Sequence, residues 1–200
     1  MHLRTLLAFT AVALATSAFA QDANVVSDSP DEFQVRYASN LNKGDSYVNI
    51  TNTGSADGLP ICALVFAFDP SEEMVSCCAC PITPNALVSL SVQGDLISNT
   101  ISPSTPTSLV IKLVSIIADN GTCAPNTPGE LVPGMRAWGT SLHALPNGTY
   151  GTTESAFLPG GLSEAEALHL FNFCNFINAN GSGFGICKSC RAGGLGGAKQ

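Results

Sequence analysis

The chain has 200 residues, of which only 12% are charged, and its formal net charge is −7 at neutral pH. This acidic balance argues against nucleic acid as a partner, because phosphate binding needs clustered Lys and Arg. The eight cysteines are an even number, which predicts a disulfide framework in an oxidising compartment.

Residues 1–20 have the three parts of a secretory signal peptide. They begin with the basic residues His2 and Arg4, continue through the apolar run 6–15 and end on an A-x-A tripeptide. This order predicts cleavage after Ala20. The apolar run is too short to span a bilayer. We therefore expect a secreted or periplasmic protein without a transmembrane anchor.

The pattern of residues 33–158 predicts an antiparallel β-sandwich, and the acidic residues 21–32 before it predict a flexible leader. Apolar and polar residues alternate along most of its short runs, and residues 61–68 are apolar on both faces, as in a central strand. Asn147-Gly148 between two such runs is a strong hairpin signal. About eight strands at short spacing are typical of a sandwich. We expect them near residues 33–37, 48–51, 61–68, 74–80, 88–92, 109–113, 135–144 and 149–157.

Three cysteines lie within four residues, Cys77-Cys78-Ala79-Cys80. Strand alternation places Cys77 on one face and the other two on the opposite face. A hairpin turn centred near Ser71 pairs Cys62 with Cys80, at a distance suited to a disulfide. We therefore predict a Cys62–Cys80 bond, and we expect Pro81 to end the strand.

Residues 159–181 predict a C-terminal helix that packs on the sandwich. Ser163-x-x-Glu166 is a capping box, in which each side chain bonds the backbone amide of the other residue. The helical period gathers an apolar surface from Leu168, Phe171, Cys174 and Ile177, and a polar stripe from His169, Asn172 and Asn175.

A Gly-rich tail with a C-x-x-C motif follows over residues 182–200. We expect Cys174 to bond Cys187 or Cys190, because a covalent bond would hold a tail too flexible to dock by packing alone. The motif lacks the strand-to-helix context of a thioredoxin-type redox site. The cysteines assigned to the disulfide framework are Cys62, Cys77, Cys78, Cys80, Cys123, Cys174, Cys187 and Cys190. The alternative is a thiolate metal site, built from Cys187 and Cys190 together with Cys77, Cys78 and Cys80.

The candidate catalytic groups are few. After removal of the signal peptide the only histidines are His143 and His169, and Ser141 shares a strand face with His143. A hydrolase using Ser141 and His143 is therefore an alternative function. Glu166 and His169 have the spacing of di-iron bundle ligands, but one helix supplies only one such motif. We assign no catalytic residue, no metal ligand and no cofactor.

Glycosylation is a further possibility that the sequence raises. The sequons lie at Asn49, Asn120, Asn147 and Asn180, and they matter only in a glycosylating host.

Four stretches resemble a family of secreted bacterial cysteine-rich proteins with no assigned activity. They are residues 47–54, 77–84, 137–143 and 183–191, which include the C-C-A-C-P and C-K-S-C motifs. The resemblance implies export and a shared scaffold, and it carries no activity. Our leading hypothesis is a secreted, disulfide-stapled module that binds an extracellular or cell-surface protein or a glycan, or that takes part in extracellular assembly.

Overall fold

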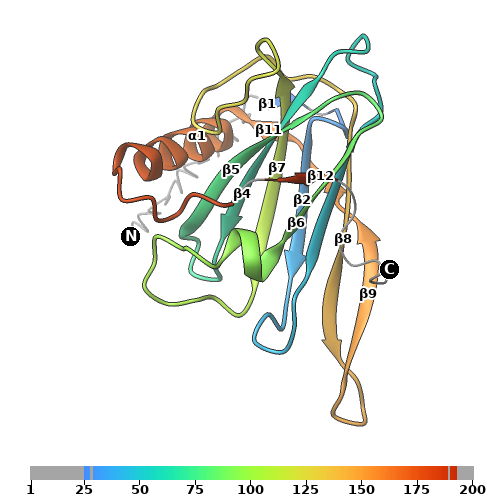
Figure 1. Cartoon of the computed structure of the whole chain (residues 1–200), viewed down its shortest axis with the longest axis vertical. Helices are drawn as coiled ribbons and strands as arrows, with labels where there is room; N and C mark the ends of the chain where they lie inside the picture. The colour runs from blue at the N-terminus through green and yellow to red at the C-terminus, as the bar shows by residue number, and fades with distance from the viewer. Residues whose placement is uncertain (1–24, 28, 189, 193–200) are drawn as a thin grey trace, which may run out of the picture.

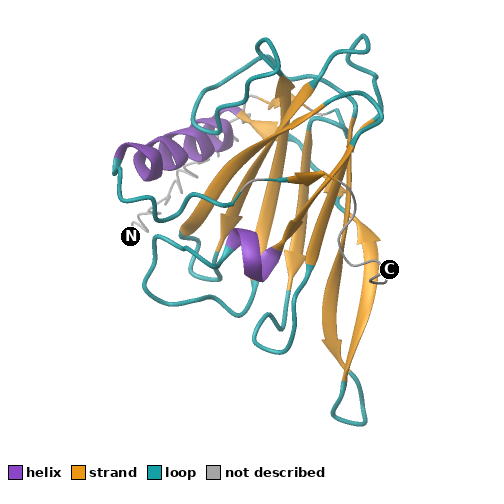
Figure 2. Cartoon of the chain, in the orientation of Figure 1, coloured by secondary structure: helices purple, strands orange, loops and turns teal. Residues whose placement is uncertain are grey.

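The computed structural model describes residues 25–192, apart from residues 28 and 189 (Figure 1). The predicted signal peptide and the end of the Gly-rich tail lie outside the described residues. Within the described part, two antiparallel sheets pack face to face and one helix covers the outer face of one sheet (Figure 2). The predicted β-sandwich with a C-terminal helix is thus confirmed.

The sheet that carries the helix is called the helix-side sheet, and its partner the far sheet. The helix-side sheet contains, in spatial order, β10 (Leu158–Pro159), β2 (Phe33–Ala38), β7 (Leu109–Ile117), β4 (Ile61–Phe68) and β5 (Met74–Ile82). The far sheet contains β12 (Arg191–Ala192), β6 (Leu87–Ser91), β3 (Tyr47–Asn52), β8 (Met135–Ala144) and β9 (Tyr150–Ala156). The remaining elements are β1 (Val25–Ser27), β11 (Leu162–Ser163), a π-helical turn η1 (Val92–Leu96) and the helix α1 (Glu164–Ala179).

Two apolar cores lie on opposite faces of the helix-side sheet. The core between the sheets joins residues such as Val65 and Ile111 of one sheet to Ile50 and Leu90 of the other. The core under the helix is formed by Phe33, Leu64, Phe66, Val114, Leu170 and Phe171, among others. Every residue of β4 is buried, as its continuous apolar run predicts, because β4 has a core on each face.

A β-bulge in β5 shifts the pairing of the β4–β5 hairpin by one residue from the register that the sequence predicts. Phe68 pairs with Met74 as expected, but Ala67 pairs with Ser76, so Val75 is an extra residue. One extra residue moves every later side chain to the opposite face. Strand β5 also continues past Pro81, in contrast to the prediction, which is tolerated because β5 is an edge strand of its sheet.

The disulfide pairing differs from the predicted one for this reason. Cys62 lies in the core under the helix, whereas Cys80 lies in the core between the sheets, so the predicted Cys62–Cys80 bond is wrong. The prediction that Cys174 bonds Cys187 or Cys190 is also wrong. The four disulfides are Cys62–Cys123, Cys77–Cys174, Cys78–Cys187 and Cys80–Cys190, with Cα–Cα distances of 5.6, 5.9, 5.4 and 5.6 Å. All eight sulfurs are in these bonds, so the structure leaves no thiolate free to bind a metal.

The tail contacts the edge strand β5 of the helix-side sheet and then the strand β6 of the far sheet. Cys77 donates its amide to the carbonyl of Gly185, at 2.9 Å, and forms a parallel bridge with Ile186 on the edge of β5. Strand β12 then pairs antiparallel with β6 of the far sheet. The bonds from Cys78 and Cys80 therefore fix a segment that covers the edges of both sheets. Covering an edge in this way protects it from pairing with another chain.

Helix α1 begins where the capping motif predicts. The Ser163 hydroxyl accepts a hydrogen bond from the amide of Glu166 at 3.1 Å. The reciprocal half of the capping box is replaced, because the Glu166 carboxylate bonds Lys112 instead. Leu168 is exposed, in contrast to its predicted burial, and Leu170 is buried in its place. The helical stripe therefore runs through Leu170, Phe171, Cys174 and Ile177.

The described part of the predicted leader is less loose than the sequence suggests. Strand β1, within the predicted leader 21–32, pairs antiparallel with β11 immediately before the helix. Asp31 is buried and forms an ion pair with Arg136 of β8. Among the described residues, no helix is long and apolar enough to cross a membrane.

Candidate binding groove

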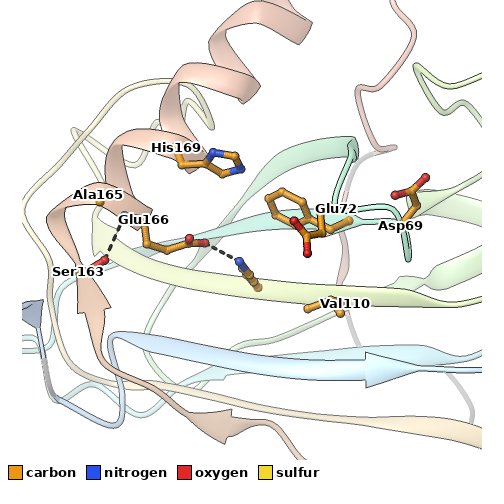
Figure 3. A pocket seen from close by; sticks show the side chains of 9 residues that line it. Asp69, Glu72, Val110, Ser163, Ala165, Glu166 and His169 are labelled. Carbon is orange, nitrogen blue, oxygen red and sulfur yellow. Dashed lines mark hydrogen bonds and ion pairs between the residues drawn. The ribbon is translucent and has the colours of Figure 1, made fainter. Parts of the chain in front are cut away.

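A hollow of about 540 Å³ lies between the start of α1 and the turn that joins β4 to β5 (Figure 3). Two further residues of the lining, Val110 and Lys112, come from β7. The hollow is lined by Phe68, Asp69, Glu72, Val110, Lys112, Ser163, Ala165, Glu166 and His169. These residues are distant in sequence, and the sandwich together with the docked helix brings them to one place.

Lys112 is the basic residue of this lining, and its charge is already neutralised. Its ammonium group lies 2.5 Å from Oε1 of Glu166 and 4.7 Å from the centre of the Phe68 ring. A cation over an aromatic face is attracted by the ring quadrupole. Lys112 is therefore held by Glu166 and Phe68, which both line the same hollow. The lining still has more carboxylates than cationic side chains.

The turn between β4 and β5 supplies those carboxylates. Asp69 Oδ1 accepts hydrogen bonds from the amides of Ser71 and Glu73, at 2.8 and 3.0 Å, and so fixes the turn. Glu72 takes a left-handed backbone conformation with φ of 66°. In the described part of the chain, no side chain forms an ion pair with the Glu72 carboxylate. Glu72 thus contributes an exposed carboxylate, unpaired among the described residues, to the wall of the hollow.

His169 joins the aromatic residues of the wall. Its ring stacks on Phe68 with centroids 5.9 Å apart, and its centroid lies 4.4 Å from that of Phe173. The sequence places His169 on a solvent-facing polar stripe, but the ring is only partly exposed because it packs between two phenylalanines. The result is an aromatic row along one flank of the helix.

A second hollow, of about 480 Å³, continues along this flank toward the end of α1. It shares Glu72 with the first hollow, and its wall is mainly apolar. It is lined by Glu72, Glu73, Met74, Ile101, Ser102, Pro103, Phe173, Phe176 and Ile177. Phe173 is 45% exposed and Phe176 is 65% exposed. We call the two hollows together the groove.

The sequence gives only a partial signal for the groove. Phe173 and Phe176 lie outside the apolar stripe that packs on the sheet, and two extra phenylalanines on a surface helix are a sign of a contact surface. Phe68, Glu72 and Lys112 carry no local signal, because their meeting depends on the pairing of β4 with β5 and β7.

Ser141 and His143, the candidate pair for a hydrolase, do not form the hydrogen bond that joins a nucleophile to its base. The Ser141 hydroxyl lies 3.2 Å from the carbonyl of Tyr37, to which it donates, and accepts from the guanidinium of Arg36. Its proton is therefore engaged by the Tyr37 carbonyl, and among the described residues no hydrogen bond joins the side chains of Ser141 and His143. A nucleophile needs a base within hydrogen-bond reach.

Arg36 explains the polarity of this region. It is buried between the sheets, and its guanidinium also donates to the Ser155 hydroxyl, at 2.9 Å. Burial lowers the pKa of the Arg36 guanidinium, and the nearby charge of Glu154 acts in the opposite direction. Arg36 therefore ties β2 to the far sheet, and Ser141 belongs to that contact.

The sequons differ in accessibility. Asn49 is buried, and its side-chain oxygen accepts a hydrogen bond from Ser89 at 2.5 Å. Asn120, Asn147 and Asn180 are exposed. Only these three could accept a glycan in the folded protein.

No protein-family model, curated protein or solved structure matches the chain. The candidate site therefore rests on the geometry of the groove alone. Among the described residues, no group of three or more His, Cys, Asp or Glu side chains could hold a metal ion.

Proposed function

We propose that this protein is an exported binding module that contacts its partner through the groove beside α1. The observation that carries the proposal is the exposure of Phe173 and Phe176 above an apolar hollow. Large aromatic side chains contribute most to binding when they enter or line such hollows. Two phenylalanine side chains left in water add little to the stability of the fold. Their exposed position is explained if a partner covers them.

Export is the second part of the proposal. It is supported by the signal-peptide pattern of residues 1–20 and by four disulfides, which persist in an oxidising compartment. The family resemblance points the same way. The exported protein should begin at Gln21, which the intact mass of protein exported by its native host would establish. A mass that starts at Met1 would contradict export by this route.

The binding function is tested by comparing variants in the native host. The fraction of exported protein retained on cells or in extracellular material is measured for the wild type, Phe176→Ser and Leu158→Ser. Leu158 is a matched control because it is 72% exposed and lies on β10, at the other edge of the helix-side sheet. We expect retention to fall in Phe176→Ser alone. Equal retention of all three proteins would contradict binding through the groove.

A further inference from the structure

We propose that the occupant of the groove is a peptide segment of another protein in which an apolar side chain stands next to Lys or Arg. This inference rests on the binding function proposed above and specifies its ligand. It follows from three properties of the groove: an apolar floor, an acidic rim and the position of one carboxylate between the two hollows.

The apolar floor favours a hydrophobic side chain. Around the second hollow, Met74, Ile101 and Phe176 supply hydrocarbon surface, and Ser102 supplies the single hydroxyl group of the lining. Burying a sugar hydroxyl without a hydrogen-bond partner is unfavourable. Burying an aliphatic or aromatic side chain in the same place is favourable. The floor therefore suits a peptide better than a glycan.

The acidic rim adds a charge requirement. Asp69, Glu72 and Glu73 all lie at the groove, whereas the ammonium of Lys112 is already paired with Glu166. A cationic group on the occupant would complement this excess of negative charge. Glu72 lines both hollows, so a Lys or Arg close to the apolar anchor would reach it.

The same rim argues against a second copy of this chain as the occupant. A symmetric dimer uses the same patch on both subunits. Pairing the groove with itself would bring the two acidic rims together, and like charges at an interface are unfavourable. A different protein with a basic segment avoids this repulsion.

The backbone of Glu72 provides a well-matched test variant. Five described residues other than glycine have positive φ, and the other four are Asn40, Asp57, Asn85 and Asn120. Asn and Asp tolerate this conformation better than other residues. The change Glu72→Asn therefore removes the carboxylate while suiting the turn, so we expect no loss of folding stability.

The experiment selects ligands from a library of random short peptides displayed on phage, with the full exported protein and its disulfides intact. Enriched sequences are then synthesised, and their dissociation constants are measured for the wild type and for four variants. We expect enriched peptides to combine an apolar residue with Lys or Arg. Phe176→Ser and Glu72→Asn should each raise the dissociation constant at least about tenfold.

Two variants serve as matched controls. Leu158→Ser removes an apolar side chain that is 72% exposed, close to the 65% of Phe176. Asp57→Asn removes a carboxylate from a residue whose backbone also has positive φ, of 50°. Asp57 precedes β4 and Glu72 follows it, so the two residues lie at opposite ends of that strand. Both controls should change the dissociation constant less than about twofold, since surface changes away from an interface are nearly neutral.

Any of the following outcomes would overturn the inference. Enriched peptides without basic residues, or unchanged affinity in Glu72→Asn, would remove the charge requirement. Binding of an uncharged glycan, or a concentration-dependent dimer, that Phe176→Ser abolishes would replace the peptide with another occupant and leave the proposed binding function standing. If peptide binding, glycan binding and dimer formation are each the same for the wild type and Phe176→Ser, the proposed function fails together with this inference.

Discussion

Cys77 and Cys78 are neighbours in sequence, but their disulfides lie on opposite faces of the helix-side sheet. Cys77 bonds Cys174 of α1 in the core under the helix, and Cys78 bonds Cys187 of the tail on the side of the core between the sheets. Strand alternation places adjacent side chains on opposite faces. Two consecutive residues thus hold two different segments against the same strand.

The disulfide connectivity is directly testable. Partial reduction and stepwise alkylation, followed by peptide mapping, should recover Cys62 with Cys123, Cys77 with Cys174, Cys78 with Cys187 and Cys80 with Cys190. Stepwise chemistry is needed because three of the cysteines would share one proteolytic peptide. A Cys62–Cys80 peptide would show that β5 lacks the bulge.

Removing the bond between the sheet and the helix should loosen the helix selectively. The double variant Cys77→Ala with Cys174→Ala should lose about 2–4 kcal/mol of unfolding free energy in urea. Hydrogen exchange should also become faster along α1. The control is Cys62→Ala with Cys123→Ala, which should lose a similar free energy while α1 stays protected. Equal protection of α1 in both variants would mean that packing alone holds the helix.

Reductant and chelator should act differently on the whole protein. Mild reductant should lower the melting temperature sharply and release thiols, because four bonds that each contribute about 2–4 kcal/mol exceed what a typical domain can lose. Strong chelator should change nothing, since every cysteine sulfur is in a disulfide. Thermal unfolding with each reagent separates the two cases. A melting temperature that falls with chelator alone would point to a metal site.

The cap of α1 has a small and measurable effect. Ser163→Ala removes the oxygen that accepts from the Glu166 amide, and it should cost about 1 kcal/mol in urea unfolding. Ser163→Thr keeps an oxygen in that position and should recover most of the loss. An Ala variant as stable as the wild type would mean that the contact between β11 and β1 fixes the start of the helix.

Gly139 marks a close contact of backbones in the far sheet. A Cβ at this position would collide with the carbonyl oxygen of Tyr47 on β3, which is backbone and cannot turn aside. We expect Gly139→Ala to cost about 1–3 kcal/mol through overpacking. Gly151→Ala on β9 is the control, because there the nearest atom belongs to the exposed His143 side chain. Similar unfolding midpoints for both variants would contradict this packing argument.

The sequence by itself determined the eight long strands and the helix in the described part of this protein. Alternation along 48–51 and 109–113 specifies half-buried strands, because successive side chains of a strand point to opposite faces. The continuous apolar run 61–68 specifies a strand buried on both faces, and the Asn-Gly turn specifies a hairpin. Ser163 likewise specifies the start of α1, since capping is a contact between residues close in sequence. These features need no information from distant parts of the chain.

Only the tertiary structure decided which cysteines are bonded to each other and which residues line the groove. The extra residue Val75 in β5 has no mark in the local sequence, yet it determines which core Cys77 and Cys80 face, and therefore which distant cysteines they can reach. Leu168 is exposed and His169 stacks on Phe68 because the docked helix presents one particular stripe to the sheet. Register and docking are chosen by contacts between residues far apart in sequence, so the residues that meet at Glu72 could be known only from the fold.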